Sequence, residues 1–188
     1  MLAVGYRDDV PDEREILSYE LFGTAARELA EQVAADGFRP DAIVGIARGG
    51  LALAGALGYA LDVKTLGSLN VEFYTGVGST LDTPVVLPPT LDRESLRGKS
   101  ILLVDDVADS GRTLHLVVEL LRAGGGEVRT VCLYSKPTTV EEPDYVWRRT
   151  SRWIMFPWSA DGPVPYPDGP SPDGPSPDGP SPDRPSPA

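Results

Sequence analysis

Segments typical of buried strands alternate with helical segments along the middle of this 188-residue chain, and this order constrains the fold most. Residues 42–46 and 100–104 are short apolar runs, typical of strands buried on both faces, and residues 128–134 predict a third strand. Residues 51–61, which are small and apolar, and residues 113–123, which are apolar on one face, predict the helices between them. Short connections between such elements indicate an α/β fold, in which a mainly parallel twisted sheet is flanked by helices.

The flanking segments complete this outline. Apolar residues at helical spacing predict a further helix over 18–36, with Gly37 after its end. Residues 64–73 are typical of extended structure, and 85–87 of a short strand inside a Gly/Pro/Thr-rich segment. Residues 138–158 are aromatic-rich and less regular, and we expect them to form a small hood to which the N-terminal segment also contributes.

The C-terminal residues 161–188 differ in composition from the rest of the chain. They hold 11 of the 19 prolines, repeat the sequence Pro-Asp-Gly-Pro-Ser and contain no aliphatic residue besides Val164 and Ala188. Such a segment has too little apolar surface to offset its ordering entropy, so we predict a disordered tail after a single domain over residues 1–160. The alternative is that the repeats bind a proline-recognising partner.

Charge and cysteine content exclude several classes of protein. The net charge is −11, of which −4 lies in residues 161–188 and −7 in the remainder. A body this acidic lacks the basic surface that nucleic acids and anionic membranes bind, so we expect neither as a partner. The single cysteine, Cys132, excludes a disulfide framework and suits a reducing compartment. The sequence shows no signal peptide and no apolar run of about 18 residues, so we expect a cytoplasmic protein.

The segment that carries chemistry follows the second apolar run. Asp105 and Asp106 stand where the strand 100–104 is predicted to end, and ligands of parallel sheets bind at the carboxyl ends of the strands. Two adjacent carboxylates there need partners, and ribose hydroxyls or a hydrated divalent cation provide them. Residues 108–113 form a glycine-containing turn that opens a helix, where free backbone N–H groups bind phosphate. The spacing therefore predicts a site for a ribose 5-phosphate.

The sequence of this segment resembles the phosphoribosyl-pyrophosphate (PRPP) signature of the type I phosphoribosyltransferases: Ile101-Leu-Leu-Val-Asp-Asp-Val-Ala-Asp-Ser-Gly-Arg-Thr113. The glycine–lysine phosphate loop and the dinucleotide fingerprint are both absent. The sequence Gly45-Ile-Ala-Arg-Gly-Gly50 resembles the family's pyrophosphate loop, in which we expect a cis peptide at Ala47–Arg48. The resemblance implies that PRPP is bound by Arg48, Gly49, Asp105, Asp106, Val107, Ala108, Asp109, Ser110, Gly111, Arg112 and Thr113.

The resemblance also implies a magnesium ion. Substrate oxygens hold most of its coordination sphere in this family, so Asp105 and Asp106 are expected to contribute mainly through water and substrate. Arg48 supplies a fixed positive charge suited to phosphate oxygens, although an ordinary surface cation is the alternative. One departure concerns the family's mobile loop, expected over 74–91, because this segment lacks the Lys or Arg that related enzymes place there.

Three motifs near the C-terminus follow an order similar to that of bacterial xanthine–guanine phosphoribosyltransferases: Tyr134-Ser-Lys-Pro137, Asp144-Tyr145 and Trp153-Ile-Met-Phe-Pro-Trp158. The resemblance implies that Lys136 contacts the purine 6-oxo group, that Trp153 stacks on the base, and that the backbone at Ile154 reads the 2-position. The alternative for Trp153 is a core aromatic, which is what we expect of Trp147 and Trp158.

Asp109 matches the family's aspartate that faces purine N7, where a carboxylate acts as the catalytic acid–base group. Its alternative is an acid favoured at a helix N-terminus. We expect transfer of 5-phosphoribosyl from PRPP to a 6-oxopurine (hypoxanthine, guanine or xanthine) in purine salvage, by a homo-oligomer (dimer or tetramer). A PRPP-binding regulator without turnover and a transferase for a pyrimidine or unusual base are the alternatives. We assign no chemistry to His115, on a solvated helix face, or to Cys132, in a buried strand.

Overall fold

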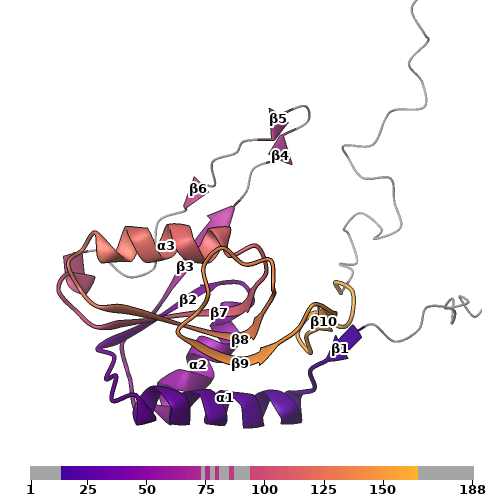
Figure 1. Cartoon of the computed structure of the whole chain (residues 1–188), viewed down its shortest axis with the longest axis horizontal. Coiled ribbons are helices and arrows are strands. Elements are labelled where there is room, and N and C mark those ends of the chain that lie inside the picture. The colour runs from indigo at the N-terminus through magenta and orange to yellow at the C-terminus, as the bar shows by residue number, and fades with distance from the viewer. Residues whose placement is uncertain (1–13, 73–74, 77–78, 81–84, 87–93, 165–188) are drawn as a thin grey trace, which may run out of the picture.

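The computed structural model describes residues 14–72, 75–76, 79–80, 85–86 and 94–164. Its centre is a six-stranded sheet with the order β6-β3-β2-β7-β8-β9 (Figure 1). The strands from β3 to β9 in this order are parallel, and β6 is antiparallel to β3. The strands are β2 (Ala42–Ala47), β3 (Leu66–Glu72), β6 (Val85–Val86), β7 (Ile101–Ala108), β8 (Val128–Ser135) and β9 (Tyr145–Arg149). The predicted α/β fold is therefore confirmed.

Helices cover both faces of this sheet. They are α1 (Tyr19–Ala35), α2 (Gly50–Ala60), α3 (Arg112–Arg122) and the short 3-10 helix η1 (Glu94–Leu96). Figure 1 shows α1 and α2 on one face and α3 on the other. Successive residues of β7 alternate between the two faces of the sheet. Leu102 and Val104 pack against α1 and α2, whereas Ile101 and Leu103 pack against α3.

Local signals in the sequence define the ends of α1. The Ser18 hydroxyl accepts a hydrogen bond from Leu21 N at 3.1 Å and so caps the first turn. Gly37, after the helix, has a φ of +77°, a left-handed conformation that glycine adopts without steric cost. The side of α1 that faces the sheet buries Ala25, Ala26, Leu29, Ala30 and Val33. The helix predicted over 18–36 is thus confirmed.

The predicted hood over 138–158 requires a correction, because part of it belongs to the central sheet. β9 pairs in parallel with β8 and forms an edge of that sheet. The carboxylate of Asp144 fixes the start of β9, since it accepts hydrogen bonds from Thr130 N at 2.7 Å and Thr130 Oγ1 at 2.9 Å. The aromatic and arginine residues of β9 lack a regular apolar alternation, which is why the sequence did not indicate a strand there.

The remaining hood is a small parallel pair of strands, β1 (Arg14–Ile16) and β10 (Trp153–Met155), at one end of the molecule (Figure 1). The N-terminal segment therefore contributes to the hood, as expected. β4 (Thr75–Gly76) and β5 (Ser79–Thr80) form a short antiparallel pair. The rest of the expected mobile loop and the predicted tail from residue 165 onward lie outside the described residues. Within the described ranges, no helix is long and apolar enough to cross a membrane.

Candidate active site

The carboxyl ends of β2 and β7 lie side by side, because the two strands are parallel neighbours. The loop after β2 contains the expected cis peptide bond between Ala47 and Arg48. The next two residues lie directly against β7: a Cβ on Gly49 would collide with the Asp106 carboxylate, and one on Gly50 with the backbone of β7. The loop needs glycine at these positions, and it places the exposed Arg48 near the end of β7.

Asp105 and Asp106 lie inside β7 and not after it, because the strand continues to Ala108. The two carboxyl groups lie close to each other, because, besides burial, both the charge of Asp106 and a hydrogen bond between the two side chains raise the pKa of Asp105. The Asp106 carboxylate lies against Gly49, at the start of α2. The Asp105 carboxylate accepts a hydrogen bond from Asp106 N at 2.9 Å. The pair is therefore presented near the carboxyl edge of the sheet, as predicted, but from within the strand.

Burial raises the pKa of both carboxyls. For Asp105 desolvation is the largest cause, and the nearby charge of Asp106 adds to it. For Asp106 desolvation again raises the pKa, although backbone N–H groups and the Trp158 indole donate hydrogen bonds that act in the opposite direction. No Lys or Arg is among the described groups that shift either pKa. Two ionised carboxylates here are stabilised by a ligand that donates hydrogen bonds or carries positive charge.

Residues 108–111, which we call the phosphate turn, connect β7 to α3. Gly111 caps α3 with a φ of +73°, a conformation that favours glycine. Ser110 and Arg112 are exposed, and Thr113 is half-buried in the first turn of α3. The turn therefore stands at a helix N-terminus, where unpaired N–H groups and the helix dipole favour an anion.

A cavity of about 410 Å³ opens beside the phosphate turn. It is lined by Val107, Asp109, Lys136, Trp153, Ile154, Met155, Phe156, Ser159 and Ala160. All four residues predicted to bind the base lie around it, so β7, β8 and β10 bring together positions that are far apart in the sequence. The side chain of Trp153 is 71% exposed, which excludes the alternative of a core aromatic. We call this space the base cavity.

Lys136 and Asp109 define the polar part of the base cavity. Lys136 Nζ donates a hydrogen bond to Arg152 O at 2.6 Å, which holds the ammonium at the cavity wall. Ile154 buries its side chain, so its backbone is the part available to a ligand. Asp109 belongs both to the phosphate turn and to the cavity wall. Asp109 therefore joins the turn to the cavity.

Known proteins share both this architecture and this sequence. The family described as phosphoribosyl transferase domain matches residues 13–162. The chain belongs to this family. A xanthine-guanine phosphoribosyltransferase from a Ruegeria species is 33% identical over 153 residues, which cover 76% of this chain and 83% of that protein.

Solved structures extend the match to the phosphoribosyltransferase fold. A purine phosphoribosyltransferase from Pyrococcus horikoshii aligns with a TM-score of 0.69 and 37% identity, covering 82% of this chain and 98% of that one. A xanthine-guanine-hypoxanthine phosphoribosyltransferase from Helicobacter pylori aligns with a TM-score of 0.63 and 26% identity, covering 77% of this chain and 92% of that one. The family resemblance inferred from residues 45–50 and 101–113 is confirmed.

Sequence reasoning missed part of this phosphoribosyltransferase site. The cavity residues that it did not single out are Met155, Phe156, Ser159 and Ala160. Trp158 was expected to be a core aromatic, and it does stack on Phe156 with ring centroids 5.0 Å apart. Its indole also donates a hydrogen bond to the Asp106 carboxylate, so Trp158 connects the segment after β10 to β7. The position of Trp158 at the end of the motif Trp153-Ile-Met-Phe-Pro-Trp158 was the available signal.

The two residues expected to carry no chemistry lie outside the base cavity. The side chain of His115 is 57% exposed, and its Nδ1 pairs with Glu141 Oε2 at 2.9 Å. Cys132 is fully buried in β8.

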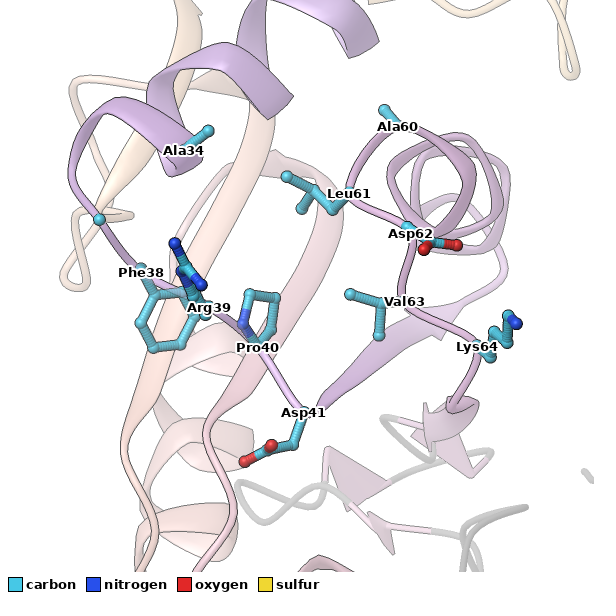
Figure 2. Close-up of a pocket in the computed structure, with 11 residues that line it drawn as sticks. Ala34, Phe38, Arg39, Pro40, Asp41, Ala60, Leu61, Asp62, Val63 and Lys64 are labelled. Atoms are coloured by element: carbon cyan, nitrogen blue, oxygen red, sulfur yellow. The ribbon is translucent and has the colours of Figure 1, made fainter.

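A larger cavity, of about 800 Å³, lies where β2 and β3 begin, at the other end of these strands from the candidate site. Figure 2 shows the residues that line it. It is bounded by the ends of α1 and α2 and by residues 37–41 and 60–64, which precede β2 and β3. Asp41, in its wall, accepts a hydrogen bond from Ser100 N at 2.9 Å and so fixes the local backbone. None of the residues predicted from the phosphoribosyltransferase motifs lines this cavity. Size alone therefore does not identify the active site.

Proposed function

We propose that this phosphoribosyltransferase moves the 5-phosphoribosyl group of PRPP to a nitrogen of a 6-oxopurine, as a step of purine salvage. Relatives named xanthine-guanine and purine phosphoribosyltransferases support transfer to a purine. The single observation that carries the assignment is the place of Asp109, which belongs to the phosphate turn and also lines the base cavity. This arrangement suits a reaction that joins a phosphoribosyl group to a base.

The reaction breaks the bond from C1′ to the pyrophosphate oxygen and forms a bond from C1′ to a purine nitrogen. The phosphate turn holds the 5-phosphate at the N-terminus of α3. Asp105 and Asp106 accept hydrogen bonds from the ribose hydroxyls, and Arg48 stabilises the charge of the departing pyrophosphate. Positioning and preorganised charge supply most of the rate in such a site.

Three residues orient the base. Lys136 donates a hydrogen bond to the 6-oxo group, and the exposed indole of Trp153 provides a stacking surface. Asp109 accepts the proton that the purine loses as the new bond forms. The polar groups of the cavity therefore match the 6-oxo and N7 edge of a purine, and the backbone at Ile154 is left to read the 2-position.

Asp105 and Asp106 also fit a magnesium ion. Both are carboxylates, the ligand type that Mg²⁺ prefers, and no described cation compensates their charge. When bound, the ion would neutralise pyrophosphate oxygens and so assist departure of that group. Substrate and water oxygens would complete its coordination sphere.

The test of the function is pyrophosphate release from PRPP in the presence of Mg²⁺ and one base at a time. Hypoxanthine, guanine, xanthine, adenine and uracil form the panel. We expect turnover with one or more of the three oxopurines and little with adenine or uracil. Turnover with uracil alone would point to a pyrimidine transferase. PRPP binding without turnover of any base would identify a regulator of the same fold.

We also propose that the chain acts in the cytoplasm as a homo-oligomer. The cytoplasmic location is supported by its single cysteine, which is free and buried, and by its proposed substrates, which are small molecules of metabolism. The exposed side of α2 supports self-association, because it presents Leu51 and Tyr59 and the helix contains no charged residue.

A further inference from the structure

Residues 136–141 leave β8 and run along the phosphate turn, and we call this segment the strap. Three consecutive carbonyl groups of the turn accept hydrogen bonds from it. The bonds are Lys136 N to Ala108 O (2.9 Å), Thr138 Oγ1 to Asp109 O (3.1 Å) and Val140 N to Ser110 O (3.0 Å). The strap therefore fixes the direction of each peptide group in the turn.

The fixed carbonyls determine where the N–H groups point. A trans peptide unit is planar, with its C=O and N–H on opposite sides. Because the strap holds the carbonyls of Asp109 and Ser110, the N–H groups of Ser110 and Gly111 in the same peptide units point away from the strap. Neither N–H group donates a hydrogen bond within the described part of the chain. Two successive free N–H groups of this kind form a concave anion site.

The strap is packed tightly on the turn and anchored beyond it. A Cβ on Gly111 would collide with the Thr139 hydroxyl and lie 2.8 Å from Glu141 N. Thr139 Oγ1 donates a hydrogen bond to Glu141 O at 2.8 Å, which stiffens the strap itself. The Glu141 carboxylate pairs with His115 of α3 at 2.9 Å. The strap thus fixes the position of the turn relative to α3.

We propose that Thr138 is a positioning residue whose hydroxyl aligns the Asp109–Ser110 peptide so that Ser110 N–H faces the 5-phosphate of PRPP. This inference rests on the proposed function, since it takes that phosphate to be the anion. Among the three bonds from strap to turn, the Thr138 bond is the one made by a side chain, so a substitution can remove it and leave the backbone bonds in place.

The test measures binding of ribose 5-phosphate to the full chain by isothermal titration calorimetry. Thr138→Val keeps the shape of the side chain and removes the hydroxyl, whereas Thr138→Ser keeps the hydroxyl. We expect Thr138→Val to raise the Kd about two- to tenfold, the effect of one lost hydrogen bond, and Thr138→Ser to stay close to the wild type. Thr24→Val is the matched control, because the Thr24 hydroxyl bonds a backbone carbonyl of α1 far from the site.

Steady-state kinetics separate positioning from a structural role. Thr138→Val should raise the KM for PRPP by the same factor and leave the KM for the purine and the melting temperature unchanged. An unchanged Kd in Thr138→Val, an equal loss in Thr138→Ser, or a parallel rise of both KM values with a lower melting temperature would overturn the proposal. Absence of ribose 5-phosphate binding by the wild type would overturn it too. Loss of binding in Thr138→Val without purine turnover by the wild type would refute the proposed function alone.

Discussion

At the scale of single residues, the proposed acid–base group Asp109 belongs to the phosphate turn and also lines the base cavity. We expect Asp109→Asn to lower kcat about 10²–10⁴-fold, because the amide cannot accept the purine proton, with little change in PRPP affinity. Asp62→Asn, in the loop after α2, is the control and should retain full activity. Full activity of Asp109→Asn would show that Asp109 has no catalytic role and is only an acidic residue favoured by the dipole at the N-terminus of α3.

Lys136 should affect binding of the base more than turnover. The Lys136 ammonium donates a hydrogen bond to Arg152 O at the cavity wall, and in its proposed role it would bind the 6-oxo group equally in the ground state and the transition state. We expect Lys136→Ala to raise the KM for guanine about 10–100-fold, the cost of a charged hydrogen bond, with a smaller change in kcat. It should also erase the preference for oxopurines over adenine. Lys64→Ala, before β3 and at the other end of the strands from the candidate site, should change neither parameter.

Two buried tyrosines differ in the partner of their hydroxyl group. Tyr145 Oη donates a hydrogen bond to Asp36 Oδ2 at 2.7 Å, whereas Tyr134 Oη has no partner among the described residues. We expect Tyr145→Phe to lower the free energy of unfolding by about 1 kcal/mol and Tyr134→Phe to raise it by about 1 kcal/mol, since an unsatisfied buried hydroxyl is destabilising. Urea denaturation at neutral pH measures both. A destabilised Tyr134→Phe variant would show that the hydroxyl is bonded in solution.

The same tyrosines predict how stability depends on alkaline pH. Burial raises the pKa of Tyr134 to about 12, and burial together with the bond to Asp36 raises the pKa of Tyr145. A folded-state pKa above the unfolded value of about 10 means that the folded state holds the proton more tightly. The stabilisation that comes from this tighter protonation is complete below about pH 10 and is lost as the pH rises through the folded-state pKa. Between about pH 10 and about pH 12, the free energy of unfolding should therefore decrease less for Tyr134→Phe than for the wild type.

Predictability differed among residues of the site for a physical reason. Asp109 and Lys136 were identified because they stand in sequence motifs that resemble those of the phosphoribosyltransferases, and the chemistry of a carboxylate and an ammonium agrees with the roles that the resemblance implies. Thr138 was not identified, because its partner is a backbone carbonyl, which every residue carries. The contact of Trp158 with Asp106 depends on how β10 approaches β7, and no local pattern specifies that approach.

At the scale of elements, the contact between the start of α2 and β7 depends on the absence of a side chain at Gly49. The backbone at Gly49 is ordinary right-handed helix, with φ of −60° and ψ of −42°, so alanine fits its conformation but not its space. We expect Gly49→Ala to displace Asp106, to lower the free energy of unfolding by about 1–3 kcal/mol through overpacking, and to raise the KM for PRPP. Thermal unfolding and steady-state kinetics measure these effects.

Gly23→Ala, in the middle of α1, is the matched control for Gly49→Ala. A Cβ at Gly23 meets nothing within 4 Å, so the substitution should stabilise the chain by up to about 1 kcal/mol and leave kinetics unchanged. A normal KM for PRPP in Gly49→Ala would show that the position of Asp106 is not set by this loop.

Helices and strands were predictable from the sequence where one local pattern, such as a regular apolar stripe or a continuous apolar run, was strong. The helix α1 has a regular apolar stripe and a capping serine, and β8 is buried along its length. β9 was misassigned to the hood because it lies at the sheet edge, where side chains mix burial and exposure. β7 was predicted too short, since its carboxyl end holds two aspartates that propensity alone assigns to a loop. The predicted strand was therefore too short at the two residues that the sequence assigned to the site.

At the scale of the whole molecule, the parallel sheet explains why the site is assembled from distant segments. The parallel strands β2, β7 and β8 end on the same side of the sheet, and the loop after each carries a different part of the proposed site: Arg48, the phosphate turn and Lys136. The hood adds Trp153 on this side. The loops that carry these parts of the proposed site therefore lie next to one another in the order of the strands, β2, β7 and β8.

Among the described helices, α2 has the exposed surface best suited to the proposed self-association. α1 and α3 carry charged residues on their exposed sides, whereas α2 has none and exposes Leu51 by 44% and Tyr59 by 96%. A chain of net charge −11 repels its own copies over most of its surface, and an uncharged face minimises that repulsion. Tyrosine at such a face combines apolar contact with a hydroxyl that stays hydrated, a composition enriched in protein interfaces.

We therefore expect the wild-type chain to run as a dimer or larger species in size-exclusion chromatography with light scattering, and Tyr59→Asp to shift it to the monomer. The substitution places a charge at the centre of the uncharged face, where burial would require its desolvation. Tyr19→Asp is the control, because Tyr19 is 66% exposed at the start of α1, where an acid is compatible with the helix dipole. A monomeric wild type would contradict self-association, and an oligomeric Tyr59→Asp variant would place the interface away from α2.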